Sequence, residues 1–396
     1  MKKNAFTLVE LLAVILILAI IALIVVPQVI NLINSSKEQS NEIGIQNYVR
    51  AIETAVMNKD LDMEVKNLNG EYTIINNGKK IQSSDNIIDI GYDGKEITLG
   101  KVRIKDYKVI ALGVEQDNKY IIYENGKIIY NGEKQSPVSF SEDSWETISL
   151  NVKVGNLSKY KVGDTREIEL KGFENGETDE NGVQIKTYTI RIANKTNTGD
   201  VCTKEYFEKE DGTKETYSKT ACGFVIEFED LILPTGDDAK MNLENINAGG
   251  WKDSKMRTYV NNTIYNALPE KLREKIINTT VVSGYGSGDA PNKVTTDKVY
   301  LLSPGEVWEQ GTSNTIDFDT ARENTRQLDY YKDVAKVTTT SYSGAIKKYN
   351  GSASSWWLRS ARSTDTGNFY GVSYYGYWYY DGATSTRWVA VAFRIG

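Results

Sequence analysis

The strongest hydrophobic pattern of the chain lies at its amino terminus. The segment Leu11–Val26 is continuously apolar, and the residues from Phe6 onward lengthen the run, interrupted only by a threonine and Glu10. At about 1.5 Å of rise per helical residue, a run of about 21 residues spans a hydrocarbon core of ~30 Å. The pair Lys2–Lys3 precedes the run and would stay on the cytoplasmic side of a membrane. The pattern therefore predicts a membrane-spanning helix.

A helical period continues beyond Pro27 in a more polar form. Apolar residues recur there at helical spacing and form one stripe, which comprises Ile45, Tyr48, Val49, Ile52 and Val56. Strand patterns follow at Tyr72–Ile75, Glu96–Ile104, Tyr107–Val114, Lys119–Tyr123 and Lys127–Tyr130. The dipeptide Asn125-Gly126 between the last two runs is typical of a tight hairpin turn. Residues 28–130 are therefore expected to form a small α+β domain.

A second domain is expected after the polar stretch 131–148, which has the composition of a linker. Strand-like runs occur first, at 166–170, 186–192 and 223–233, and a strand is expected at 299–302. Helices are predicted at 254–266 behind a capping serine, at 269–278 behind a proline, near 319–333 and at 343–349. An apolar strand, 389–395, closes the chain. Residues 149–396 thus form the larger α+β domain of this interpretation.

The charge and the residue composition exclude several classes of function. The chain has 47 Lys and Arg against 53 Asp and Glu, a formal net charge of −6, and no histidine. Catalysis by Ser-His-Asp or Cys-His pairs and imidazole metal ligation are therefore impossible. A mildly acidic chain also lacks the basic face on which nucleic-acid binding depends. We expect a protein that is not an enzyme and that uses no cofactor, metal or nucleic acid, although paired carboxylates stay open until their positions in space are known.

The two cysteines lie in the second domain. Cys202 and Cys222 flank a charged segment that reads as a long hairpin. If this domain is exported, a disulfide is favoured and would stabilise it by roughly 3 kcal/mol. The alternative is a pair of independent reduced thiols.

Tyrosines gather near the carboxy terminus. Six of the 25 tyrosines fall in one short stretch, namely Tyr370, Tyr374, Tyr375, Tyr377, Tyr379 and Tyr380. One interpretation is a β-hairpin with aromatic cross-strand pairs, but alternate strand residues face opposite sides, so it does not explain adjacent tyrosines. Serine, glycine, aspartate and threonine accompany the tyrosines, as in antibody binding loops. The pattern favours a ligand-binding surface, to which Ser373, Asp381 and Thr384 would add polar contacts.

The amino-terminal sequence AFTLVELL resembles the prepilin signal of type IV pilins and of the pseudopilins of type II secretion and competence systems. The resemblance implies a leader, residues 1–5, that a prepilin peptidase removes after Ala5, and a mature chain that starts at N-methylated Phe6. It also implies that residues 6–27 form a transmembrane and assembly helix, in which Glu10 pairs with a neighbouring subunit. Families of this kind usually have glycine before the cut, where this chain has Ala5. A cleaved secretory signal fits less well, because no small-x-small site follows the apolar run.

The second domain resembles another family. The sequences WWLRSA and VAFRIG, with GGWKDSKMRTYVNNTIYNALP and DKVYLLSPGEVW before them, resemble C-type-lectin-fold domains related to the formylglycine-generating-enzyme fold. In diversity-generating retroelements, such a segment, here about 356–396, is the variable region, and adenine-directed mutation yields Tyr, Ser, Asp, Gly and Thr. The cysteines of the enzyme branch and the calcium motifs of true lectins are missing from their expected places.

These expectations describe an α+β protein with a long helix on a small antiparallel sheet and a larger C-type-lectin-like domain. It would be a minor pilin or pilin-like protein of the bacterial surface, which crosses the cytoplasmic membrane once before assembly. Its partners would be other pilin subunits and an external protein or glycan, which the tyrosine-rich domain recognises in adhesion. The alternative is a structural pseudopilin of a secretion or DNA-uptake machine whose terminal domain packs against other subunits.

Overall fold

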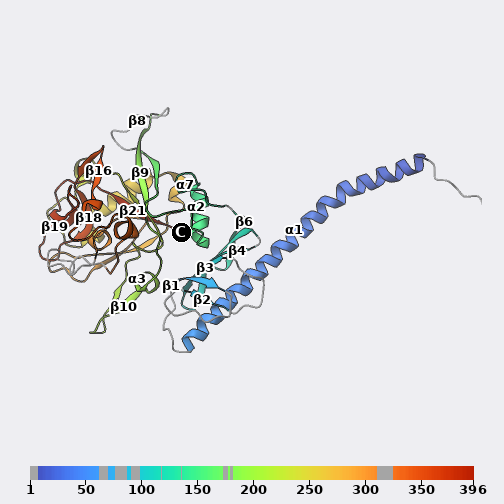
Figure 1. Ribbon diagram of the computed structural model, residues 1–396, viewed down its shortest axis with the longest axis horizontal. Coiled ribbons are helices and arrows are strands. Elements are labelled where there is room, and N and C mark those ends of the chain that lie inside the picture. The colour runs from blue at the N-terminus through green and yellow to red at the C-terminus, as the bar shows by residue number, and fades with distance from the viewer. Residues whose placement is uncertain are drawn as a thin grey trace, which may run out of the picture.

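The computed structural model describes residues 8–61, 70–75, 87–90, 99–116, 118–134, 136–172, 177–178, 182–309 and 324–396. It is a mixed α and β structure in which a long helix, a small sheet and a larger carboxy-terminal domain follow one another along the chain (Figure 1). Ala5 and Phe6 lie outside the described residues, and so does the side chain of Glu10.

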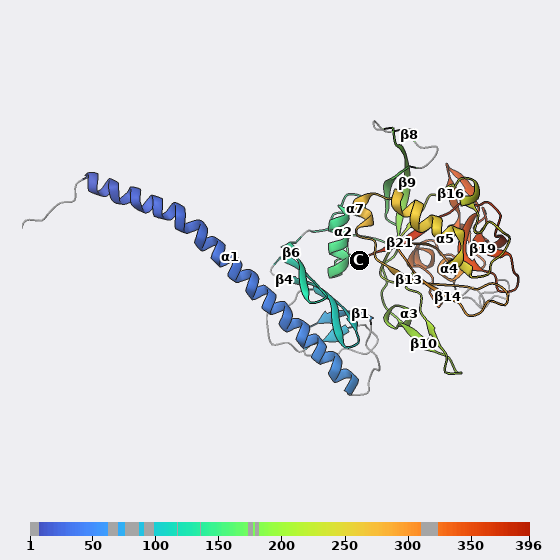
Figure 2. The same ribbon diagram turned by 180° about the vertical axis from the view of Figure 1, so that it is seen from behind.

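Helix α1 (Leu8–Leu61) reaches far beyond the rest of the molecule and is bowed along its length (Figures 1 and 2). Its segment Leu12–Val29 is long and apolar enough to cross a membrane, with a mean hydropathy of 3.0, and none of its described side chains is buried within the protein. Pro27 lies inside this helix. The carboxy-terminal part of α1 packs instead on the first sheet, where the expected stripe from Ile45 to Val56 is buried. This prediction is confirmed.

The first sheet has six strands in the order β2-β1-β3-β4-β5-β6. The strands are β1 (Gly70–Ile75), β2 (Ile87–Asp89), β3 (Leu99–Lys105), β4 (Lys108–Gln116), β5 (Lys119–Glu124) and β6 (Lys127–Glu133). All neighbouring pairs are antiparallel except β1 and β2. Asn125 and Gly126 join β5 to β6 with φ angles of 47° and 90°, which is the left-handed backbone that the dipeptide predicted.

Helix α2 (Trp145–Val154) connects the two domains and belongs to both cores. Ser144 caps it by accepting a hydrogen bond from the Thr147 amide at 3.1 Å. Leu150 and Val154 pack on β5 of the first sheet, whereas Trp145 and Ile148 enter the core of the larger domain. The connection is therefore shorter than the expected linker 131–148, because β6 extends to Glu133 and α2 begins at Trp145.

Gly113 allows α2 to lie directly on the first sheet. A Cβ atom at this position of β4 would come within 2.5 Å of the Lys153 carbonyl oxygen, so any other residue would push the helix away. The two domains thus meet through close backbone packing at α2.

The larger domain is built around a second six-stranded sheet, with the order β15-β21-β12-β9-β7 and β8 beside β9. These strands are β7 (Thr165–Lys171), β8 (Glu177–Thr178), β9 (Gln184–Asn194), β12 (Phe224–Phe228), β15 (Val299–Leu301) and β21 (Val391–Ile395). The last strand lies between β15 and β12, so the end of the chain is held in the middle of the domain.

Smaller antiparallel sheets surround this one. They are formed by β10 (Tyr206–Glu208) with β11 (Lys214–Thr216), β13 (Thr279–Ser283) with β14 (Lys293–Asp297), β16 (Lys347–Tyr349) with β17 (Ser352–Ser354), and β18 (Trp356–Ala361) with β19 (Asn368–Val372) and β20 (Trp378–Gly382). One large hydrophobic core, with members from Phe140 to Ile395, lies within this domain.

Short helices complete the larger domain. They are α3 (Asp200–Thr203), η1 (Gly236–Ala239), α4 (Gly250–Asp253), α5 (Lys255–Tyr259), η2 (Val260–Ile264), α6 (Tyr265–Ala267), α7 (Glu270–Arg273), α8 (Pro304–Val307), η3 (Tyr330–Val334) and η4 (Ser343–Ala345). Ser254 caps α5 as expected, with a bond of 3.1 Å from the Arg257 amide. The helix behind Pro269 is shorter than predicted and ends at Arg273.

The helix expected at 343–349 is wrong. Only η4 is helical there, and Lys347–Tyr349 forms β16 of a hairpin with β17. The reason is the turn Asn350-Gly351, whose φ angles of 47° and 81° repeat the geometry of the first hairpin. The same dipeptide signal was present in the sequence and outweighs the helical spacing before it.

Candidate functional site

The tyrosine-rich segment forms the hairpin β19–β20 at the end of the molecule farthest from the free end of α1 (Figures 1 and 2). Tyr370 lies opposite Tyr380 and Val372 opposite Trp378. β18 pairs with the other edge of β19 and is buried along its whole length. The hairpin therefore rests on a rigid, apolar base.

The turn of this hairpin projects two adjacent tyrosines. The Ser373 amide donates to the Tyr377 carbonyl at 2.7 Å and closes the turn. Gly376 has a φ of 86°, and a Cβ atom there would approach the Tyr342 carbonyl oxygen to 2.2 Å, so only glycine fits. Tyr374 and Tyr375 stand at the tip, 49% and 62% exposed, with ring centroids 3.9 Å apart.

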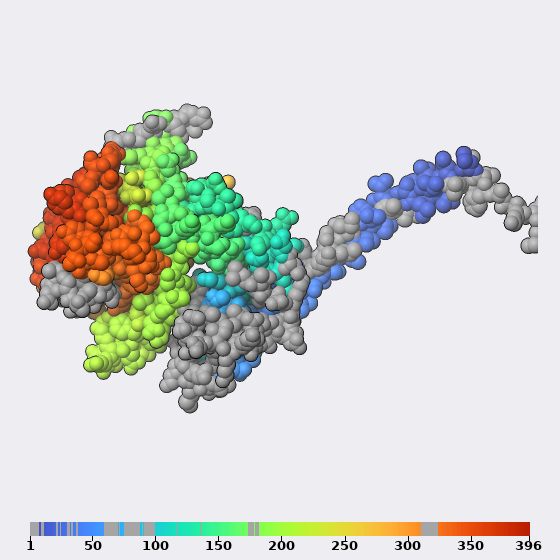
Figure 3. All heavy atoms as spheres, viewed as in Figure 1, coloured from blue at the N-terminus to red at the C-terminus, as the bar shows by residue number. Residues whose placement is uncertain are grey.

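Further aromatic rings form a continuous row, which we call the aromatic strip: Tyr342, Tyr377, Trp378 and Tyr380. Neighbouring ring centroids lie 5.0 Å, 5.4 Å and 6.5 Å apart along it. Tyr380 is 42% exposed, and the other three are half-buried. The space-filling view shows how the segment that carries them covers this end of the larger domain (Figure 3). Aromatic rings grouped in this way offer a large contact area at low entropic cost.

Two arginine side chains contact the tyrosines of β20. The Arg387 Nε donates to the Tyr379 hydroxyl at 2.9 Å, and the same guanidinium pairs with Asp381. Asp381 also accepts a hydrogen bond from Ser385 at 2.8 Å. Burial raises the pKa of Tyr379 to about 12, so its hydroxyl stays protonated at neutral pH. Arg362 covers one face of Tyr380, with its guanidinium carbon 3.8 Å from the ring centroid.

The expected ligand-binding residues separate into three groups. Tyr374, Tyr375 and Tyr380 are exposed, whereas Ser373, Tyr377, Tyr379, Asp381 and Thr384 are half-buried around them. Tyr370 is a correction to the expectation, because it is 1% exposed and packs in the core. Its strand is covered on both faces, so its side chain cannot meet a ligand. The β-hairpin interpretation thus accounts for Tyr370, which pairs across the strands. The adjacent tyrosines Tyr374 and Tyr375 lie instead in the exposed turn.

Two residues of the site lie outside the set that the sequence indicated. Tyr342 comes from the loop before η4 and joins the strip through Tyr377. Arg362 follows β18 and pairs with Asp365 at 3.0 Å while it covers Tyr380. The abundance of tyrosine could not identify either one, because their place in the site depends on the folding of distant segments.

The structure joins Cys202 and Cys222 in a disulfide, with Cα atoms 5.3 Å apart. The bond connects α3 to the segment before β12, on the side of the domain that faces the first sheet. It is therefore remote in the fold from the hairpin β19–β20.

Two wholly buried carboxylates of the larger domain are engaged in ion pairs. Glu306 pairs with Arg359 at 2.7 Å, and Glu227 pairs with Arg191 and Lys347 at 2.8 Å and 3.1 Å. Among the described residues, no group of three or more Cys, Asp or Glu side chains is arranged to hold a metal ion. The exposed tyrosines of the hairpin thus belong to a domain whose core contains these buried ion pairs.

Comparison with known families gives two matches. Residues 1–26 match the prokaryotic N-terminal methylation motif, and residues 224–396 match a family described as a domain of unknown function (DUF6273). The second match begins at β12 and leaves out α2, β7 and β9, which belong to the same core. No curated protein and no solved structure matches the chain.

The methylation motif is a prepilin-type signal, and it supports a type IV pilin-like or pseudopilin-like protein. It implies processing by a prepilin peptidase and assembly with other pilin subunits. The signal and the apolar part of α1 together fit a membrane-anchored pilin before assembly.

Proposed function

We propose that this protein is a minor pilin or pilin-like surface protein that displays its carboxy-terminal domain for adhesion to an external protein or glycan. The amino-terminal helix anchors and assembles the subunit, and recognition takes place at the turn tyrosines and the aromatic strip. The protein acts by binding and catalyses no reaction.

The exposed tyrosines at the end of the molecule carry this proposal. Tyr374, Tyr375 and Tyr380 are large apolar side chains that leave much of their surface in water, although the domain has an extensive core in which to bury them. Grouped exposed aromatics mark interaction sites rather than ordinary surface. These tyrosines lie at the end of the molecule opposite the membrane helix. This end would therefore meet a ligand outside the cell first.

Local rigidity supports the same conclusion. Gly376 fixes the turn, β18 pairs with the β19 edge of the hairpin, and Arg387 fixes Tyr379 through its hydroxyl. Side chains that are already ordered lose little entropy when a ligand binds, which favours affinity. Phenol rings can stack on a sugar or a peptide and use their hydroxyls as hydrogen-bond partners.

We further propose that the domain is of the C-type-lectin-like kind and that a retroelement diversifies its last segment. Between residues 373 and 384, the Tyr, Ser, Asp and Thr residues, which are products that adenine substitution gives, are all exposed or half-buried, whereas Gly376 and Ala383 are buried. Variation at these positions would then change the surface of the hairpin and leave the buried residues beneath it unchanged. A template copy in the genome that differs only at adenines, beside a reverse transcriptase gene, would support this, and a locus without either would contradict it.

The function is tested with the full chain displayed on cells. Cells that carry the wild type are screened against arrays of glycans and of surface proteins, and the bound partner is then tested with the variant Tyr374→Ala/Tyr375→Ala. We expect adhesion to be lost, because both rings leave the surface, while expression and thermal stability stay the same.

The matched control is Tyr206→Ala, which removes a tyrosine that is 36% exposed on β10, outside the hairpin. Adhesion should be unchanged by it. Equal adhesion of the double variant and the wild type, together with loss of assembly, would instead favour a structural pseudopilin whose terminal domain packs on other subunits.

A further inference from the structure

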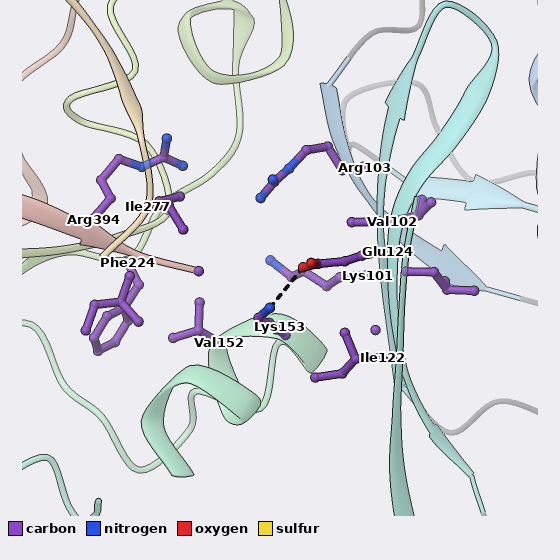
Figure 4. Close-up of a pocket in the computed structure, with 16 residues that line it drawn as sticks. Lys101, Val102, Arg103, Ile122, Glu124, Val152, Lys153, Phe224, Ile277 and Arg394 are labelled. Atoms are coloured by element: carbon purple, nitrogen blue, oxygen red, sulfur yellow. Dashed lines mark hydrogen bonds and ion pairs between the residues drawn. The ribbon is translucent and has the colours of Figure 1, made fainter. Parts of the chain in front are cut away.

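Two neighbouring hollows lie where the first sheet faces the larger domain. Their volumes are about 90 Å³ and 480 Å³, and both are lined by Arg103, Ile277 and Arg394, so they form one continuous cleft. Figure 4 shows the smaller hollow, with Arg103 and Lys101 on the side of the sheet, Arg394 and Ile277 on the side of the larger domain, and α2 at its floor. The larger hollow has the size of an ordinary ligand site. We call the two together the interdomain cleft.

Strand β3 supplies one wall of this cleft with a regular row of cations. Its sequence alternates, so that Val102 and Ile104 are buried against α1 while Lys101, Arg103 and Lys105 point to the other side. Arg103 and Lys105 are exposed, and within the described residues no carboxylate lies at salt-bridge distance from either one. The alternation therefore directs positive charge toward the cleft, most plainly at the exposed Arg103 and Lys105.

The opposite wall is cationic as well. Lys204, Lys219 and Arg394 line it, and Glu205 is the carboxylate side chain on that wall. At the floor, Lys153 and Glu124 pair with each other at 2.9 Å and add no net charge (Figure 4). Lys204 is partly compensated by Asp200 at 2.8 Å. Among the described residues that line the cleft, cationic side chains therefore outnumber carboxylate side chains, although the whole chain is acidic.

Lys219 is the most deeply buried lysine of this wall, and its pKa is strongly lowered. Burial, helped by the neighbouring charge of Arg394, lowers its pKa to about 8, and Glu205 offsets only part of this effect. Its ammonium group donates to the carbonyl oxygens of Val201 and Lys204, so its position is fixed. An anionic group in the cleft would relieve the repulsion between Lys219 and Arg394.

We propose that the interdomain cleft binds an extended acidic peptide segment of a partner protein. Alternate residues of an extended chain are about 6.8 Å apart, which is also the spacing of Lys101, Arg103 and Lys105 along β3. A segment with carboxylates on alternate residues can therefore meet the row in register, while Arg394 and Lys219 close on it from the other wall. Charge-assisted hydrogen bonds from arginine to carboxylate would supply most of the affinity.

This site is separate from the aromatic strip and does not depend on the proposed adhesion. It lies next to α2 and the disulfide, between the domains, whereas the strip lies at the far end of the larger domain (Figures 1 and 4). A partner held here would bridge the pilin-like part and the displayed domain.

The test uses the full chain in a neutral detergent and a fluorescent peptide of the sequence Glu-Ala-Glu-Ala-Glu with blocked ends. We expect binding that weakens steeply with salt, and no binding of the matched peptide Gln-Ala-Gln-Ala-Gln. Removing two charged donors by Arg103→Gln/Lys105→Gln should weaken binding about tenfold or more, which corresponds to a loss of about 1.4 kcal/mol or more, because both side chains lose their attraction to the carboxylates. Lys105→Gln alone should give a smaller loss in the same direction.

The control variant is Lys127→Gln, which removes an exposed cation on β6 outside the cleft and should leave binding unchanged. Circular dichroism verifies that every variant is folded. Equal losses for the control and the cleft variants, or equal binding of the neutral peptide, would overturn the proposal. Binding of tripolyphosphate but not of the acidic peptide would overturn it in favour of a phosphate-bearing ligand.

Discussion

Arg359 and Glu306 form a bidentate ion pair in the centre of the larger domain. The guanidinium Nη1 and Nη2 donate to the two carboxylate oxygens of Glu306, each at 2.7 Å, and both side chains are wholly buried. Arg359 also donates to the Leu301 and Val282 carbonyl oxygens, at 2.8 Å and 3.0 Å. Glu306 in turn accepts from the Ser303 amide at 3.0 Å. One pair thus ties β18, the strand that supports the aromatic hairpin, to β13, β15 and α8.

Replacing Glu306 should destabilise the larger domain strongly. Glu306→Gln leaves the buried charge of Arg359 without its counter-ion, which typically costs about 3–5 kcal/mol in the free energy of unfolding. Urea denaturation monitored by tryptophan fluorescence measures the loss. The control is Lys240→Gln at the exposed pair with Asp237, where a loss below about 1 kcal/mol is expected. Equal losses at the two sites would mean that the buried pair contributes no more than a surface contact.

The tyrosines of one hairpin should differ sharply in their contribution to stability. Tyr370 is buried, so Tyr370→Ala opens a cavity and should lower the free energy of unfolding by about 3–5 kcal/mol. Tyr375→Ala removes an exposed ring and should stay within about 0.5 kcal/mol of the wild type. Chemical denaturation of the two variants side by side measures the difference. A large loss for Tyr375→Ala would assign the turn to the folding core and would weaken the proposed binding role.

Reduction of the disulfide should lower the thermal stability of the larger domain. Opening the bond between Cys202 and Cys222 restores the freedom of the intervening loop in the unfolded chain, which costs roughly 3 kcal/mol. The melting temperature should therefore fall when a phosphine reductant is added. The double variant Cys202→Ser/Cys222→Ser should melt at the lower temperature with or without reductant. If the melting temperature of the wild type does not change on addition of reductant, the disulfide does not contribute to thermal stability.

The lowered pKa of Lys219 predicts that its contribution to the free energy of unfolding increases with pH. Its pKa is lowered by burial to about 8, whereas an unfolded lysine keeps the ordinary value of about 10.5. Between these two values the unfolded chain binds more protons than the folded one, so this residue increases the free energy of unfolding as pH rises. The contribution is the difference between the wild type and Lys219→Met, measured by denaturation at several pH values. That difference should grow in favour of the wild type from pH 7 to 9.5, and a difference that is constant or shrinks would refute the assignment.

Local sequence patterns predicted the elements that depend on neighbours along the chain. The stripe from Ile45 to Val56, the turn at Asn125-Gly126 and the cap at Ser254 all follow from residues within one or two helical turns or one hairpin. The error at 343–349 is also local, because the turn signal of Asn350-Gly351 lies next to the segment and prevails over its helical pattern in the structure.

Contacts between distant segments were not visible in the sequence. The sequence around Trp145 does not indicate that α2 packs into two cores. This packing depends on Gly113 and Tyr120 of the first domain. It also depends on Phe140 and Phe224 of the larger domain. The row Lys101, Arg103 and Lys105 is plain in the sequence as an alternation, but only the facing Arg394 and Lys219 make it one wall of a cleft.

The sequence alone determined the prepilin signal, the apolar helix and the local excess of tyrosine, because short motifs, hydrophobic periodicity and composition are properties of contiguous residues. The tertiary structure decided which tyrosines can meet a ligand. It buries Tyr370 between the layers of the core and leaves Tyr374 and Tyr375 at a turn that Gly376 and the backbone of Tyr342 hold in place. Burial depends on what packs over a strand, and the segments that pack over this one are far away along the chain.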